Sequence, residues 1–163
     1  MSVKINYLNK TINNLTSNLI LFSNEKFDIK NLKKNLSNSE FLYINDLLKN
    51  SDLKKKILVF ELNSKRKIIL ISIKKNLSDS EAENLGAKFY DKFKDTRDKE
   101  FNVNSDTISI KIKKLIGNFL HGIKLKSYIF DKYKTNKKKN NISINLFGKN
   151  ILSSKEQLKF NAI

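Results

Sequence analysis

Cysteine is absent from this 163-residue sequence, and histidine occurs only once. Without cysteine the chain can form neither a disulfide framework nor a thiolate metal site, which fits a reducing compartment. Any Ser-His-Asp arrangement would have to use His121, and no Gly-x-Ser-x-Gly turn accompanies it. We therefore interpret His121 as a structural or surface side chain of a helix.

Glycine is also scarce, and its four residues form neither a Gly-x-Gly-x-x-Gly motif nor a P-loop. Phosphate cradles depend on glycine-rich backbone, so the sequence does not predict an NAD or ATP fold. Metal-binding spacings such as His-Glu-x-x-His are missing, and Asp91, Asp95 and Asp98 sit beside lysines as in a solvated helix end. We predict no catalytic residue, no metal ligand and no cofactor in this chain.

Long apolar runs are missing as well. The longest, such as the segment from Lys67 to Ser72, are far too short to span a bilayer. Met1 is not followed by the basic and apolar stretches of a signal peptide. We expect a soluble, cytoplasmic protein with no membrane partner.

Positive charge, by contrast, is abundant: the net charge is +17, although only two of the 33 basic residues are arginine. Frequent Lys, Asn, Ile and Phe are typical of A/T-rich coding sequence, which is one explanation of this charge. The other is a nucleic-acid partner, because positive charge attracts phosphate in a sequence-independent, salt-sensitive way. The candidate phosphate contacts are Lys132, Lys137, Lys138 and Lys139, which could equally belong to a solvated loop.

Strand and helix patterns alternate along the chain, with no repeat and no linker between them. Period-two alternation or short apolar runs predict six strands, at 3–7, 19–22, 57–62, 67–73, 108–112 and 142–146. Helical spacing predicts helices at 40–49, from an N-cap at Ser78 to Phe93, and at 114–128, with a further helix beginning near Ser153. Six strands among about three helices predict an α/β fold with a mixed sheet between helical layers.

One segment carries a specific resemblance. From Gly122 to Thr135 the chain follows the pattern Gly-x-x-Leu-x-x-Tyr-x-Phe-x-x-Tyr-Lys-Thr. This pattern resembles the signature that closes the N-terminal domain of leucyl (cytosol) aminopeptidases. The residues that match its fixed positions are Gly122, Leu125, Tyr128, Phe130, Tyr133, Lys134 and Thr135. The chain departs from the family at Ile73-Lys74-Lys75-Asn76, where the family often has a glycine-rich stretch.

The resemblance implies a macro-domain-like fold for residues 1–152, followed at 153–163 by the start of a linker helix toward a peptidase domain. It implies a parent enzyme that removes N-terminal residues from peptides with two divalent metals, zinc or manganese. In the family the metal ligands lie in the C-terminal domain, whose Asn-Thr-Asp-Ala-Glu-Gly-Arg signature does not occur here. The chain's expected partner is that peptidase domain, within a homohexamer.

Two other interpretations stay open at this point. A basic nucleic-acid-binding domain fits the charge, and some bacterial members of the family bind DNA. An ADP-ribose-binding macro domain fits the expected fold, although the scarcity of glycine argues against a backbone-lined pyrophosphate site.

Overall fold

The computed structural model describes residues 3–7, 18–104, 114–133 and 142–147. Their strands are β1 (Val3–Tyr7), β2 (Asn18–Ser23), β3 (Ile57–Asn63), β4 (Arg66–Ser72), β5 (Glu100–Asn104) and β6 (Ile142–Phe147). The helices are α1 (Asn38–Leu48), α2 (Asp79–Phe93) and α3 (Leu115–Tyr133), with a 3-10 helix at Lys30–Asn35. None of these helices is long and apolar enough to cross a membrane.

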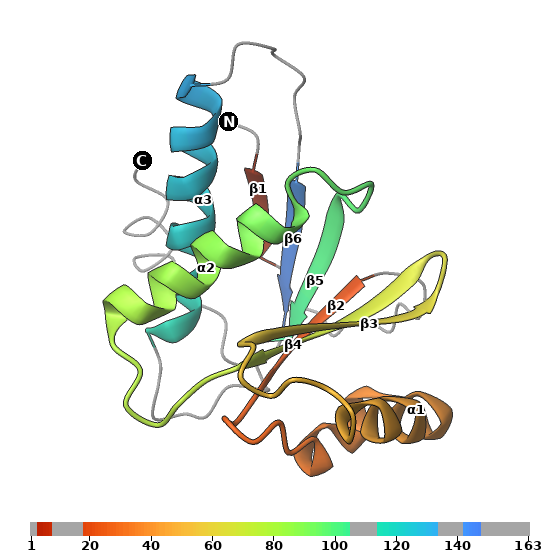
Figure 1. The fold of residues 1–163 in the computed structure, drawn as a ribbon. Coiled ribbons are helices and arrows are strands. Elements are labelled where there is room, and N and C mark those ends of the chain that lie inside the picture. The colour runs from red at the N-terminus through yellow and green to blue at the C-terminus, as the bar shows by residue number, and fades with distance from the viewer. Residues whose placement is uncertain (1–2, 8–17, 105–113, 134–141, 148–163) are drawn as a thin grey trace.

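The six described strands form one sheet in the order β1-β6-β5-β2-β4-β3. Every neighbouring pair is parallel except β3 with β4, which form an antiparallel hairpin. The hairpin turn lies between Asn63 and Arg66, in the gap between the predicted strands at 57–62 and 67–73. Figure 1 shows α2 and α3 on one side of the sheet and α1 on the other. The predicted mixed sheet between helical layers is confirmed.

The larger core lies between the sheet and the α2–α3 layer. Alternate residues of the strands face it, such as Ile20 and Phe22 on β2 and Ile69 and Ile71 on β4, all at most 1% exposed. Aromatic rings fill its centre, with Phe89 in contact with Phe93, Phe101 and Phe119.

A smaller core lies on the opposite face, under α1 and the 3-10 helix. It takes the other alternate residues of the same strands, including Leu21, Ile68 and Leu70. The middle strands are therefore apolar on both faces, which is why β2 and β4 are continuous hydrophobic runs. Ile44 is the fully buried anchor that α1 contributes.

The remaining half of that second face is polar. An amide ladder crosses three strands there: Asn6 Nδ2 donates to Asn145 Oδ1 at 2.9 Å, and Asn145 Nδ2 donates to Asn102 Oδ1 at 3.0 Å. The in-register pairing of β1, β6 and β5 brings these three side chains into line. The ladder satisfies polar groups across β1, β6 and β5 on a face that α1 covers only over β2, β4 and β3.

Serine caps begin both α1 and α2. Ser78 is the N-cap of α2 as predicted, and its hydroxyl accepts from the Glu81 N–H at 3.1 Å. At α1, Ser37 and Glu40 form a reciprocal capping box. The helix therefore begins at Asn38, two residues before the predicted start.

One described strand, β5, is not among the six that the sequence predicts. The predicted strand at 108–112 lies outside the described residues, and so does the predicted helix at 153–163. The strand β5 instead lies at Glu100–Asn104, where only Phe101 and Val103 are apolar. Because buried asparagines occupy its other face, β5 has too few hydrophobic residues for a pattern to identify it.

Candidate functional site

Two glycines set the contact between α2 and α3. A Cβ atom added to Gly86 would lie 2.0 Å from the Phe119 carbonyl oxygen, and one added to Gly122 would lie 2.0 Å from the Glu83 carbonyl oxygen. Both distances are far below van der Waals contact, so the two helix backbones touch where each carries a glycine. Gly122, which opens the segment that resembles the aminopeptidase signature, therefore has a packing role that requires the absence of a side chain.

The only histidine lies beside this crossing. His121 Nδ1 is 3.3 Å from Glu83 Oε1, so the pair links α3 to α2 near Gly122. Both side chains are partly exposed, and no nucleophile is among the described partners of the ring. This arrangement agrees with a structural side chain that joins two helices.

The other residues of the Gly122–Thr135 segment and the candidate phosphate contacts lie either on α3 or outside the described part of the chain. Leu125 and Tyr128 lie on α3 and are exposed, at 38% and 49%. Phe130, Tyr133 and the candidate phosphate contact Lys132 belong to the last turn of α3. The remaining residues lie outside the described part of the chain; they are Lys134, Thr135, Lys137, Lys138 and Lys139. The proposed phosphate contacts therefore stay predictions.

In open α/β sheets, ligands bind at the carboxyl ends of the strands, where neighbouring connections leave toward opposite faces. Here β2 leads to α1 on one face of the sheet, and β5 leads to α3 on the other. The expected ligand position is therefore beyond Ser23 at the end of β2 and Asn104 at the end of β5. Both side chains are buried.

The loop after β2 is held tightly by local bonds. Asn24 Oδ1 accepts from the backbone N–H groups of Lys26 and Asp28 at 3.1 and 3.0 Å. Phe27 has a positive φ of 53° and buries its ring in the smaller core. Neither this loop nor the segment from Ile73 to Leu77 after β4 contains glycine. The described loops therefore offer no glycine backbone of the kind that approaches a pyrophosphate closely.

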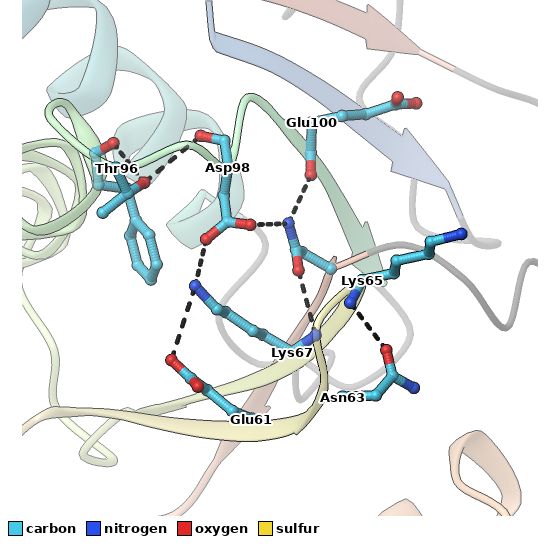
Figure 2. A network of polar contacts seen from close by, with 9 residues as sticks. Glu61, Asn63, Lys65, Lys67, Thr96, Asp98 and Glu100 are labelled. Atoms are coloured by element: carbon cyan, nitrogen blue, oxygen red, sulfur yellow. Dashed lines mark hydrogen bonds and ion pairs between the residues drawn. The ribbon is translucent and has the colours of Figure 1, made fainter.

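A polar network occupies the opposite edge of the sheet, at the amino ends of the strands (Figure 2). Asn18 accepts from the Lys67 N–H at 3.1 Å and donates to Asp98 Oδ1 at 3.3 Å and to the Glu100 carbonyl at 3.2 Å. Lys67 Nζ forms an ion pair with Asp98 and lies 3.8 Å from Glu61 Oε1. One asparagine thereby links the amino ends of β4 and β5 to β2.

This network corrects one prediction. Asp98 is not a solvated carboxylate at a helix end, since its side chain is only 19% exposed and is bonded to Lys67 and Asn18. Asp91 is half exposed and lies within 4 Å of both Lys94 and Lys126. Within the described ranges, no group of three or more His, Cys, Asp or Glu side chains could hold a metal ion.

Comparison with known proteins gives structural matches and no sequence match. No protein-family model and no curated protein matches the sequence. The fold is similar to a tomato leucine aminopeptidase mutant, with a TM-score of 0.65 and 15% identity over 97% of this chain and 34% of that chain. It is also similar to the macrodomain of Thermus aquaticus DarG, with a TM-score of 0.57 and 8% identity over 90% of this chain and 99% of that chain.

Because both sequence identities are low, these likenesses establish the fold alone. The predicted macro-domain-like α/β fold is confirmed, with a whole macrodomain matched by most of this chain. The chain spans about a third of the length of the aminopeptidase that it matches.

Proposed function

We propose that this chain is the non-catalytic N-terminal domain of a leucyl-aminopeptidase-type metallopeptidase. The observation that carries the proposal is the coverage of the structural match: 97% of this chain corresponds to 34% of an aminopeptidase chain. This is the coverage expected when a single domain is compared with a larger enzyme, because nearly all of the domain is matched and most of the enzyme is not.

The signature segment adds support from a different source. The pattern from Gly122 to Thr135 resembles the family's segment, and Gly122 lies where α3 touches α2 backbone to backbone. A glycine that the packing requires, at the position where the family pattern has one, links the sequence resemblance to the shared fold.

In this proposal the chemistry belongs to the rest of the parent. Two divalent metals, zinc or manganese, would be held by the C-terminal peptidase domain, where they would activate water and polarise the peptide carbonyl. This chain would contribute a folded domain to the parent and to its homohexamer, in the cytoplasm. Its partner would be the peptidase domain of the same polypeptide.

The proposal is tested by assaying hydrolysis of leucine p-nitroanilide by the purified chain in the presence of manganese or zinc. We expect no turnover above the rate with metal alone, whereas the full-length gene product turns the substrate over under the same conditions. Metal-dependent turnover by the 163-residue chain would overturn the proposal. So would a full-length product that is inactive on leucyl substrates with either metal.

A second candidate function is binding to nucleic acid, favoured by the net charge of +17. Binding to phosphates weakens with salt in proportion to the number of contacts. A titration of duplex DNA across a salt series measures that dependence directly. Absence of binding at 0.15 M salt, or an affinity that does not change with salt, would remove this candidate.

A further inference from the structure

A hollow of about 300 Å³ lies beside α2, between it, α3 and the segment before β3. Its charged and polar lining comes from three elements: α2 supplies Glu81, Asn84, Lys88 and Asp91, α3 supplies Lys126, and the segment before β3 supplies Lys56. The α2 residues recur at spacings of three and four, so they share one face of that helix. The fold therefore brings residues that are far apart in the sequence together around the hollow.

Both carboxylates of the hollow already have cationic partners. Glu81 Oε2 lies 2.7 Å from Lys74 Nζ, and Glu81 Oε1 accepts from the Ser78 hydroxyl at 3.2 Å. The hydrogen bond from Lys74 lowers the pKa of Glu81, so this carboxylate is ionised and already has a cationic partner. Asp91 Oδ1 lies 3.5 Å from Lys94 Nζ, and Asp91 Oδ2 lies 3.7 Å from Lys126 Nζ.

The ammonium groups of the hollow are less well matched. Lys56 and Lys88 are exposed, and neither forms an ion pair with a described carboxylate. Lys126 shares Asp91 with Lys94 in an exposed contact, which is a weak interaction that another anion can replace. The local charge therefore favours an anion, and the amide of Asn84 offers a further donor.

We propose that this hollow binds a phosphate monoester carried by a small molecule, held by Lys56, Lys88 and Lys126. Lysine is a compact point charge that binds phosphate without the bidentate geometry of arginine. Three lysines that line one hollow favour a doubly charged monoester over a singly charged phosphodiester. The volume lies at the small end of ligand pockets, which suits a small phosphorylated compound.

The test follows the NMR signals of the lysine Hε–Cε groups while inorganic phosphate, glycerol phosphate or dimethyl phosphate is added at constant ionic strength. We expect saturable shifts of Lys56, Lys88 and Lys126 with the first two, with a Kd on the order of 1 mM. Dimethyl phosphate, a diester, binds at least about tenfold more weakly. Lys49, which is exposed on another part of the surface, shows no saturable shift.

Matched variants on α2 separate this site from general charge. Lys88→Gln weakens glycerol phosphate binding at least about tenfold, whereas Lys92→Gln removes the same charge outside the hollow and changes it less than about twofold. Equal effects of the two variants, or linear shifts at all lysines alike, would overturn the proposal. Equal binding of the diester would also overturn it, in favour of a nucleic-acid backbone as the ligand.

Discussion

Gly86 and Gly122 lie where the backbones of α2 and α3 touch, because an added Cβ at either position would be 2.0 Å from a carbonyl oxygen of the other helix. We predict that Gly122→Ala destabilises the protein by about 2 kcal/mol or more. Overpacking costs about 1–3 kcal/mol, and a Cβ 2.0 Å from a backbone oxygen belongs at the upper end of that range. Alanine's better helix propensity returns at most about 1 kcal/mol of this cost. Urea unfolding followed by circular dichroism measures this difference in the free energy of unfolding.

The matched control is Lys92→Ala, at an exposed position of α2. It should change the free energy of unfolding by less than about 0.5 kcal/mol, as surface substitutions usually do. If Gly122→Ala were as mild as this control, the close helix crossing would be wrong.

The ion pair between Arg66 and Glu40 fixes α1 against the start of β4, with Arg66 Nε 2.7 Å from Glu40 Oε2. Burial alone would raise the pKa of Glu40, but bonds from Arg66 and the Ser37 N–H outweigh it and hold the pKa below its ordinary value of 4.5. Because the pKa is lowered on folding, the pair stabilises the protein above pH 4.5 and loses this effect as the pH falls through the folded value.

We predict that Glu40→Gln lowers the free energy of unfolding by about 3 kcal/mol at pH 7, because it removes the carboxylate that pairs with the buried Arg66. The difference from the native chain shrinks as the pH falls below 4.5. Urea titrations between pH 7 and pH 3 measure it, with the exposed Glu25→Gln as control. A difference that stays constant with pH would contradict the account of this pair.

Among the elements, the network that includes Lys67 and Asp98 (Figure 2) lies at the amino ends of the strands. It joins the amino ends of β2, β4 and β5, whereas ligands of open α/β sheets bind at the carboxyl ends. We predict that Asn18→Leu costs about 2 kcal/mol or more, because it leaves the Lys67 N–H without its acceptor. Thermal and urea unfolding measure the loss.

Asn63→Ala is the comparison for this variant. Asn63 accepts from the Lys65 N–H at 2.8 Å in an exposed turn, where water can replace the bond. A cost below about 1 kcal/mol is expected there. Equal costs at the two asparagines would show that the buried network adds nothing beyond a local turn.

The elements that the sequence predicts correctly are those in which local pattern and tertiary packing agree. The stripe of Ala82, Leu85, Phe89 and Phe93 predicts α2, and the same residues face the larger core. The strand β5 was missed because its second face is polar, and its asparagines are explained only by neighbours such as Asn145 on β6. Asp98 was misjudged for the same reason, since its partner Lys67 is 31 residues away.

For the molecule as a whole, a macro-domain-like fold does not by itself predict an ADP-ribose site, because a fold does not determine function. The loops after β2 and β4 contain no glycine, and the first is held rigid by Asn24 and the buried Phe27. We predict that millimolar ADP-ribose leaves the melting temperature unchanged, measured beside an ADP-ribose-binding macro domain as positive control. A shift of several degrees would instead support the ADP-ribose interpretation.

The candidate site was predictable only in part. Gly122 could be recognised from the signature, but its contact with the Glu83 carbonyl depends on how α2 crosses α3, which no local pattern encodes. The hollow that we propose for phosphate depends in the same way on Lys56, Lys88 and Lys126, which come from three different elements.

We propose that this chain is one domain of a longer aminopeptidase, and the mass of the native gene product tests this proposal most directly. The protein is captured from its source cells with an antibody raised against this chain, and its intact mass is measured. The match to 34% of an aminopeptidase chain predicts a single polypeptide roughly three times the 19.0 kDa of this chain. A native product of 19.0 kDa would contradict the claim.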